Sequence, residues 1–403
     1  MSMHTEQAAI EVRIDWEQNT VHHRVRQHFG KFNFWRDILP GALAVKLPES
    51  SGEWVSDSFA AGELVAPWSA SNIHTVKRSE LRLARKNGPS IELHVGRHYP
   101  RYIAAGTADI YAGNVQPLRV IGLDADSVTI DLNHPLARCP LVVAARIVSH
   151  TGAAEEHGGR CNDVVEDVLA AGAGLETLHA PGETDFFSGE PFARLDARSD
   201  QLFYSEPRLL QHLDTTAIEQ IRELYGRQLQ PGMQVLDLMS SWVSHLPDIE
   251  GLTVTGLGMN AGELAANPQL AARLIHDLNE DPRLPFPDNH FDAAVCSVSI
   301  EYLTRPVDVL RELGRILKPG SPAMITFSDR WFPTKAIALW GDLHPFERMA
   351  LVLEYFRQAA NFTRLATETV RGLPRPETDK YADQRSVSDP VYSVCGYAAA
   401  QSD

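Results

Sequence analysis

The C-terminal half of the chain alternates segments of helical apolar spacing with short apolar stretches, and this alternation restricts the fold more than any other feature. A helix is predicted over 215–229, after the N-cap residue Asp214. Short strands are predicted at 235–238, 252–257, 274–278, 291–299 and 323–327, with a helix at 306–317 and a late edge strand at 392–397. Such alternation predicts an α/β doubly wound, Rossmann-like domain with a parallel sheet covered by helices.

Acidic residues lie at or near the ends of two of these predicted strands. Asp237 interrupts the first apolar stretch, and Asp277 lies near the end of the third. In an open α/β sheet the ligand crevice lies at the carboxyl ends of the strands, where the strand order reverses. We therefore expect Asp237, Asp277 and the turn 297–302 to converge on one cleft.

Two runs of residues in this half resemble those of class I S-adenosylmethionine-dependent methyltransferases. The stretch from Asp277-Leu278-Asn279 through the run LPFPDNHFD at 284–292 is similar to that superfamily's third-strand acid and its LPF-x-D-x-x-FD run. The run RELGRILKPG at 311–320 is similar to its E-x-x-R-x-L-K-P-G helix and turn. The resemblance covers roughly half of the chain and implies methyl transfer from S-adenosylmethionine, an enzymatic activity.

The resemblance also implies a set of cofactor contacts. Asp277 would accept from the adenine amino group, and the Leu278 N–H would donate to the ring. Asp237 and the loop after it, near a helix N-terminus, would hold the amino-acid end. Both acids could instead be structural, Asp277 as a turn or cap residue and Asp237 as a strand-end residue. The implied cofactor-binding residues are Asp237, Met239, Ser240, Ser241, Gly258, Asn260, Asp277, Leu278 and Ser297.

The sequence departs from the family pattern in two places. The glycines of the family's acid-x-Gly-x-Gly-x-Gly loop are absent from 237–243, which reads DLMSSWV. The acid that usually ends the second strand is absent from 256–260, where Asn260 is the candidate substitute. Glycines permit close backbone approach to a ligand. Their loss keeps open a non-catalytic binding protein as an alternative function.

Three side chains are candidates for catalytic roles. Transfer of a methyl group depends on positioning and desolvation, and a base is needed only where the acceptor carries a proton. Tyr204 and His212 belong to a segment expected to cover the cofactor, and Tyr302 follows the fourth strand. Alternatively, Tyr204 is a packing residue and His212 a surface residue. His245 is expected on a helix after the first loop. The aromatic residues of 328–349 would either roof a small apolar acceptor or form a helical core.

The N-terminal half has a second resemblance. Short strands are predicted at 90–95, 118–123 and 127–132. The run DLNHPLA at 131–137, followed by LVVAARI at 141–147, resembles the ending of FKBP-type peptidyl-prolyl isomerases of the bacterial SlyD kind. Arg138 replaces that family's glycine, and the stretch 79–96 is expected to replace its insert. Tyr111, Phe34 and Trp68 are candidate pocket aromatics.

These observations predict two domains and a linker. Residues 1–150 would form a β-rich α+β FKBP-like domain, 151–200 a helical linker or docking segment, and 201–403 the methyltransferase domain. The expected function is methylation of a small molecule, with the N-terminal domain docking or capturing the substrate. An alternative is methylation of a peptide or protein bound at that domain, coupled to isomerase or chaperone activity.

Composition bears on partners and location. A formal net charge of −15 argues against a nucleic-acid-binding surface, and no apolar run is long enough to span a membrane. The stretch 1–19 lacks the pattern of a secretory signal. Four scattered cysteines, with no zinc-knuckle spacing, favour a reducing cytoplasm. His157-x-x-x-Cys161 is half of a metal site at most, and no metal is expected.

Overall fold

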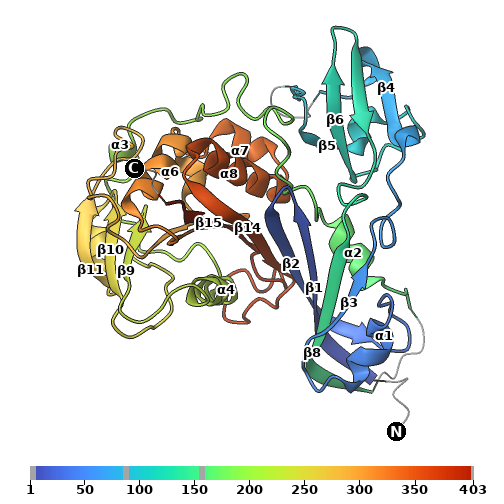
Figure 1. Cartoon of the computed structure of the whole chain (residues 1–403), viewed down its shortest axis with the longest axis horizontal. Coiled ribbons are helices and arrows are strands. Elements are labelled where there is room, and N and C mark those ends of the chain that lie inside the picture. The colour runs from blue at the N-terminus through green and yellow to red at the C-terminus, as the bar shows by residue number, and fades with distance from the viewer. Residues whose placement is uncertain (1–5, 85–89, 154–158, 401–403) are drawn as a thin grey trace. The chain divides into compact units, whose positions relative to one another are not determined.

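The computed structural model describes residues 6–84, 90–153 and 159–400 (Figure 1). The chain divides into two compact units. Unit 1 comprises residues 1–19, 31–191 and 346–350, and unit 2 comprises 20–30, 192–345 and 351–403. The longest continuous part of unit 2 begins after Pro191, within the segment expected as a linker. Residues 20–30 belong to unit 2 because β2 (Val21–Asn33) pairs in parallel with β14 (Phe362–Arg371) over 22–27.

Unit 2 contains the expected parallel sheet. Its five parallel strands lie in the order β11-β10-β9-β12-β13. Their bounds are β9 Gln234–Leu238, β10 Thr253–Gly258, β11 Leu270–Ile275, β12 Ala293–Ser297 and β13 Pro322–Phe327. The strand order reverses between β9 and β12, so the fold places a ligand crevice at the carboxyl ends of these two strands.

Two strand predictions need correction. β15 (Val391–Ala398) is an interior strand, antiparallel to both β13 and β14, whereas the sequence suggested an edge strand. β11 begins at Leu270 rather than at 274, which leaves Asp277 in the turn beyond the strand. Most β11 side chains are exposed, because it is the outermost strand, so its sequence lacks the continuous apolar run of a buried parallel strand.

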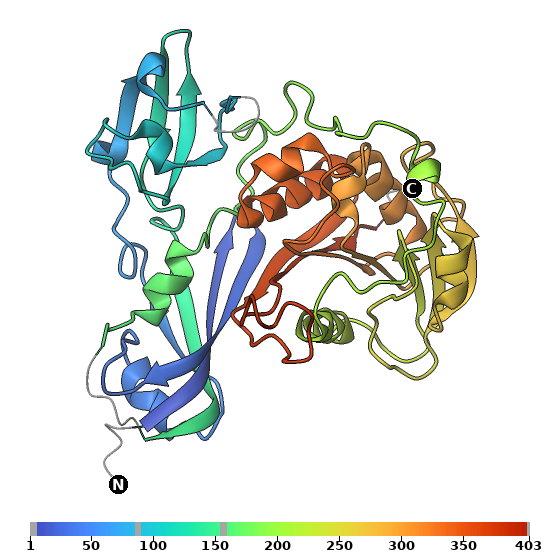
Figure 2. The same cartoon turned by 180° about the vertical axis from the view of Figure 1, so that it is seen from behind.

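Helices cover both faces of this sheet. α4 (Thr215–Gly226) begins as predicted at Asp214, whose carboxylate accepts from the Ala217 N–H. Its buried face, including Ile221 and Tyr225, packs in one core with residues of β9, β10, β12 and β13. Figures 1 and 2 show α4 on the opposite side of the strands from α6 (Pro306–Ile316). The remaining helices are α3 Asp200–Phe203, α5 Ala261–Ala266, α7 Ala338–Asp342 and α8 Pro345–Ala359.

Unit 1 contains two antiparallel arrangements of strands. β8 (Leu141–Ala153) pairs with β1 (Glu6–Gln18) and with β3 (Val55–Phe59). A second sheet has the order β4-β7-β6-β5, with bounds Ile73–Lys77, Ser127–Asp131, Pro117–Leu123 and His98–Pro100. The predicted strands at 118–123 and 127–132 are thereby confirmed, whereas 90–95 is not a strand.

The second sheet of unit 1 has its own core, which includes Val120, Val128 and Ile130. The sequence had suggested only a short insert at 79–96, but the chain between β3 and β8 forms a four-stranded sheet. The short helices of unit 1 are α1 Leu43–Lys46 and α2 Val164–Ala170, and 3-10 turns occupy Leu47–Glu49, Ala70–Asn72, Arg78–Glu80 and Arg101–Ala104.

The DLNHPLA run at 131–137 connects β7 to β8. Asn133 ties it to the turn before β4, because its Oδ1 accepts from the Ser69 N–H at 2.9 Å and from the Asn72 amide at 3.0 Å. Arg138, which follows this run, lies with its guanidinium 3.9 Å from the centre of the Trp68 ring. The run therefore acts as a structural connection, and Arg138 covers one candidate pocket aromatic.

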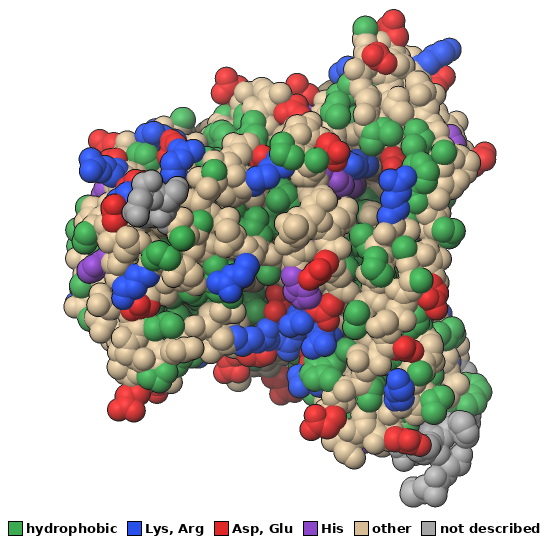
Figure 3. Space-filling view, in the orientation of Figure 1, with side chains coloured by type: hydrophobic (Ala, Val, Ile, Leu, Met, Phe, Trp, Pro, Cys, Tyr) green, Lys and Arg blue, Asp and Glu red, His purple; other side chains and the backbone are tan. Residues whose placement is uncertain are grey.

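Among the described residues, no helix combines the length and apolar character that crossing a bilayer requires. On the face drawn in Figure 3, Lys, Arg, Asp and Glu side chains are scattered among uncharged ones.

Candidate active site

A cavity of about 490 Å³ opens at the carboxyl ends of the parallel strands of unit 2. Loops after β9, β10, β11, β12 and β13 contribute to its walls, together with the segment before α4. The structure brings nearly all the predicted site residues to this cavity. Those that line it are Tyr204, His212, Asp237, Met239, Ser240, Ser241, Gly258, Asp277, Leu278, Ser297 and Tyr302.

Asn260 is the predicted residue that does not line this cavity. It lies at a second pocket, which shares Tyr204, Met259 and Asp277 with the first. Its side chain is already engaged: Oδ1 caps α5 by accepting from the Glu263 N–H at 3.0 Å, and Nδ2 donates to the Tyr204 carbonyl at 2.8 Å. Asn260 therefore fixes the segment that carries Tyr204.

Asp237 is buried at the end of β9 and faces the cavity. The Ser240 hydroxyl donates to its carboxylate at 2.5 Å. Burial raises the pKa of Asp237 to about 7, although hydrogen bonds from Ser240 and Ser244 oppose the rise. The charge of this carboxyl group can therefore change near neutral pH when a cation binds beside it.

The loop after β9 has an extended course, and no helix follows it in residues 239–250. Met239 has φ of +57° and His245 has φ of +54°. The expectation of His245 on a helix was therefore wrong, and the helix N-terminus beside the loop is that of α5, whose first-turn residue Glu263 accepts from the Ser241 hydroxyl. Asn267 holds the loop instead, donating to the Ser241 carbonyl at 2.9 Å and to the Ser244 hydroxyl at 2.8 Å. His245 also lines the cavity, and burial lowers its pKa to about 4.

Asp277 shapes the turn after β11 and also faces the cavity. Its Oδ1 accepts from the backbone N–H of Asn279 at 3.0 Å and of Glu280 at 3.3 Å. Among the described residues, Oδ2 of Asp277 forms no hydrogen bond. Asp277 is thus a turn residue that also lines the cavity, and its contact with the cofactor stays a prediction.

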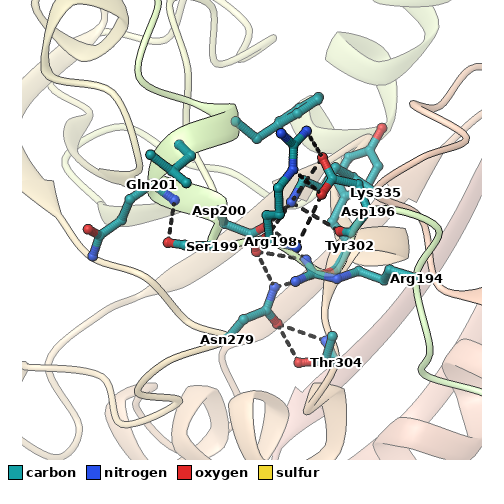
Figure 4. A network of polar contacts seen from close by, with 12 residues as sticks. Arg194, Asp196, Arg198, Ser199, Asp200, Gln201, Asn279, Tyr302, Thr304 and Lys335 are labelled. Atoms are coloured by element: carbon teal, nitrogen blue, oxygen red, sulfur yellow. Dashed lines mark hydrogen bonds and ion pairs between the residues drawn. The ribbon is translucent and has the colours of Figure 1, made fainter.

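Asn279 connects this turn to the loop after β12 (Figure 4). Its amide donates to the Tyr302 carbonyl at 2.9 Å and to Asp200 Oδ2 at 2.8 Å, and its Oδ1 accepts from the Thr304 N–H at 2.7 Å. The side chain therefore fixes Asp277 and Tyr302 relative to each other. Its neighbour Asp277 and its partner Tyr302 were recognised from the sequence, but Asp200 and Thr304 are distant in sequence and gave no signal.

Asp200 anchors the other side of this network. Two cations neutralise it: Arg194 at 2.8 Å and Lys335 at 3.0 Å. The Lys335 ammonium also donates to the carbonyls of Asp196 and Arg198, at 3.2 and 2.7 Å (Figure 4). Lys335 is buried, so these contacts hold the segment 194–200 against the loop after β13.

An aromatic cluster around Phe332 covers one wall of the cavity. The ring centre of Phe332 lies 5.1 Å from that of His212, 5.6 Å from Phe203 and 6.0 Å from Tyr302. The Phe332 N–H donates to the Tyr302 hydroxyl at 2.9 Å. Both alternatives for residues 328–349 are therefore partly right: Trp331 and Phe332 line the cavity, and Trp340 is buried in the core against Phe327.

The protonation of the three candidate catalytic side chains follows from their surroundings. Burial raises the pKa of Tyr302 and of Tyr204, so both phenols keep their protons at neutral pH. Burial, the Lys380 ammonium and the Arg208 guanidinium lower the pKa of His212. His212 is therefore neutral at pH 7 and can accept a proton.

Several lining residues were missed from the sequence. They are Asp200, Arg208, Glu263, Asn279, Lys380 and Tyr381, among others. Lys380 and Tyr381 come from the long connection between β14 and β15, which has no periodicity to place it. Glu263 lies in α5, directly after the strand end where the family's acid is missing, and that position was the one available signal.

The described residues contain no group of three or more His, Cys, Asp or Glu side chains arranged to hold a metal ion. His157 lies outside the described residues, and Cys161 is exposed.

Comparison with known proteins finds a family match in the segment that forms much of this cavity. Residues 240–325 match the family model described as a methyltransferase domain. The ubiquinone/menaquinone biosynthesis C-methyltransferase UbiE of Laribacter hongkongensis is 26% identical over 162 residues, 38% of this chain and 65% of that protein. UbiE of Burkholderia mallei is 31% identical over 121 residues, 29% of this chain and 49% of that protein. The chain thus spans less than two thirds of the length of these relatives.

Solved structures that match part of this chain include the putative methyltransferase of Haloferax volcanii in complex with its Trm112 activator. It is 18% identical, with a TM-score of 0.34, and the match covers 47% of this chain and 94% of that chain. A SAM-dependent methyltransferase from Aquifex aeolicus is also 18% identical, with a TM-score of 0.32 over 50% of this chain and 97% of that chain. The family match places a methyltransferase domain at residues 240–325, in the C-terminal part of the chain, and S-adenosylmethionine is the cofactor that this domain implies.

Proposed function

We propose that the chain transfers a methyl group from S-adenosylmethionine to a small-molecule acceptor bound in the cavity of unit 2. The observation that carries this proposal is the convergence of Asp237, Asp277 and Tyr302 on one cavity at the strand-order reversal. Its volume of about 490 Å³ is within the range of small-molecule and cofactor sites.

The residues present fit the cofactor. Three carboxyl groups, those of Asp237, Glu263 and Asp277, line the cavity and can accept from amino and hydroxyl groups. Arg208 supplies a cation, and its Nη1 is buried without a hydrogen-bond partner. When bound, the cofactor supplies the electrophilic methyl group. Asp277 would hold the adenine end, and Asp237 the ammonium end.

The remaining side chains position the acceptor. The Tyr302 hydroxyl accepts from the Phe332 N–H and retains its own proton, so it can donate a hydrogen bond to the acceptor. Neutral His212 can take a proton from the acceptor where the acceptor carries one. Tyr204 would help to close the cavity against water, beside Phe332 and Trp331.

The acceptor class is suggested by the cavity walls and by the relatives. Trp242, Trp331, Phe332 and Tyr381 provide aromatic surface for a flat or apolar acceptor. The two UbiE relatives are C-methyltransferases by name. We therefore propose ring-carbon and enol-type acceptors as the first compounds to screen.

We propose that the N-terminal part, which resembles FKBP-type isomerases, docks or captures the substrate rather than catalysing isomerisation. Tyr111 and Val115 are 67% and 76% exposed on a connection of the four-stranded sheet, and such apolar side chains suit docking. Arg138 over Trp68 favours docking, because it occupies one face of an aromatic that a proline pocket would use.

The experiment combines binding with turnover. Calorimetric titration of S-adenosylmethionine and S-adenosylhomocysteine into the wild type should give micromolar binding, weakened at least about tenfold in Asp277→Asn. Incubation with methyl-labelled cofactor and the acceptor panel should then label one compound. A folded wild type that binds neither nucleoside would overturn the proposal and favour a non-catalytic binding protein. Labelling of peptides alone would favour a peptide methylase.

A further inference from the structure

Several polar groups of the loop after β9 form hydrogen bonds with other parts of the protein. The Ser240 N–H donates to the Leu257 carbonyl at 2.7 Å, and the Ser240 hydroxyl donates to Asp237. The Ser241 hydroxyl donates to Glu263 Oε2 at 2.6 Å. These donors are therefore committed. A glycine-rich loop can offer its backbone N–H groups to an anionic ligand, but Ser240 and Ser241 cannot offer the groups named here.

The same end of the cavity is acidic. Asp237 and Glu263 both line it, and both accept from the loop serines. An amino-acid group carries an ammonium and a carboxylate. The ammonium is matched by this acidic lining, whereas the carboxylate would be repelled unless a cation lies nearby.

Arg208 is fixed beside this loop. Its backbone N–H donates to Glu263 Oε1 at 2.7 Å, so Glu263 holds Arg208 through one oxygen and Ser241 through the other. The Arg208 guanidinium lies 4.1 Å from the ring centre of Phe203, and its Nη2 donates to the Phe203 carbonyl at 2.8 Å. Stacking and hydrogen bonding thus fix the guanidinium at the wall of the cavity.

The guanidinium of Arg208 lacks a counter-charge. Among residues 6–84, 90–153 and 159–400, no carboxylate forms an ion pair with it, and its Nη1 is buried without an acceptor. A buried guanidinium nitrogen without an acceptor is unfavourable. A ligand carboxylate is the complementary group, because it can accept from a guanidinium in a bidentate arrangement.

We propose that Arg208 binds the carboxylate of the cofactor's amino-acid end and so takes over a task of the missing glycine loop. This inference rests on the proposed function, since it requires the cofactor to occupy the cavity. It assigns the two charges of the amino-acid end to different partners: the ammonium to the acidic lining around Asp237, and the carboxylate to Arg208.

The test compares two nucleosides that differ in the amino-acid end. S-adenosylhomocysteine carries the carboxylate, and 5′-methylthioadenosine lacks it. Both are titrated calorimetrically into the wild type, Arg208→Met, Arg208→Lys and the control Arg305→Met, whose exposed arginine pairs with Asp308 on α6. In Arg208→Met we expect affinity for S-adenosylhomocysteine to fall at least about tenfold, with binding of 5′-methylthioadenosine within about twofold of wild type.

Arg208→Lys should keep part of the preference for S-adenosylhomocysteine, and Arg305→Met should match the wild type. The ratio of the two affinities is decisive. If Arg208→Met leaves this ratio unchanged, whether or not both affinities fall, the inference is overturned and the proposed function stays intact. Failure of the wild type to bind either nucleoside would instead reject the proposed function. If Arg208→Met does not fold, the ratio in Arg208→Lys decides, because lysine keeps an apolar stem over Phe203.

Discussion

The carbonyl oxygen of Ser240 lies 2.2 Å from the point where a Cβ atom at Gly258 would be. The serine loop therefore crosses the end of β10 and excludes a side chain at the strand end, where the family usually has an acid. The loss of the loop glycines and the loss of the acid at the end of the second strand therefore have one structural cause. The altered loop leaves room only for a glycine at position 258. We predict that Gly258→Ala lowers the free energy of unfolding by about 1–3 kcal/mol, because backbone must move.

Gly258→Ala should also abolish detectable binding of S-adenosylhomocysteine, since the displaced loop carries Asp237's partner Ser240. Chemical denaturation and calorimetry measure the two effects. The matched control is Gly341→Ala in α7, where an added Cβ meets no atom within 4 Å and alanine should be neutral or slightly stabilising. Wild-type stability and binding in Gly258→Ala would contradict this account of the missing acid.

Binding of the cofactor should release a proton from Asp237. Without ligand its pKa is about 7, raised by burial, so the carboxyl group is largely protonated at pH 6. A bound ammonium favours the carboxylate, which lowers that pKa. Below pH 7 binding must displace the proton of Asp237, so affinity for S-adenosylhomocysteine should fall by up to about tenfold for each pH unit below 7. Above pH 7 the affinity should level off.

Titrations at pH 6 in two buffers of different ionisation enthalpy would measure release of close to one proton, and about none at pH 8.5. Asp237→Asn should remove the pH dependence and bind more weakly at pH 8.5. Equal proton release by wild type and Asp237→Asn would show that another group titrates.

His212 should titrate below the ordinary histidine range. Burial, Lys380 and Arg208 all lower its pKa. NMR titration, with the resonance assigned through His212→Gln, should place this pKa below 6.5. Lys380→Met should raise it, because one positive charge is removed, whereas Lys318→Met should not, because Lys318 pairs with Asp292. A pKa above 6.5 in the wild type would remove His212 as a neutral proton acceptor at pH 7.

The parallel strands of unit 2 could be predicted to the extent that they are buried. β9, β12 and β13 are interior strands with almost wholly buried side chains, so each is mainly apolar, with Asp237 interrupting the apolar run of β9. β11 is the outermost strand and mostly exposed, and the prediction shifted it toward the apolar residues near Leu278. The interior place of β15 depends on pairing with β13 and β14, which local pattern does not encode.

The cavity could be predicted from strand-end acids, and the residues that hold them could not. Asp237 and Asp277 follow apolar runs, so their place at the crevice was inferred correctly. Asn279 acts through contacts with Asp200 and Thr304. The loop after β9 was expected to lead into a helix because the family does, but its serines and Asn267 bind distant partners and hold it extended.

A buried acid in unit 1 should make the stability of the chain depend on pH. Glu176 is fully buried, and its Oε2 accepts from the Gly174 N–H at 2.7 Å. Burial raises its pKa to about 8, from 4.5. Between these two pH values, Glu176 keeps its proton in the folded chain and has lost it in the unfolded chain. The free energy of unfolding therefore decreases as pH rises from about 4.5 to about 8.

Glu176→Gln keeps the shape of the protonated acid and cannot ionise. We therefore predict that its melting temperature exceeds that of the wild type at pH 8 by at least about 3 °C and matches it near pH 4.5. Glu166→Gln, at an exposed position in the first turn of α2, is the control and should show no such pH-dependent gain. If the two variants shift equally, or if the Glu176→Gln gain is the same at both pH values, ionisation of Glu176 does not limit stability.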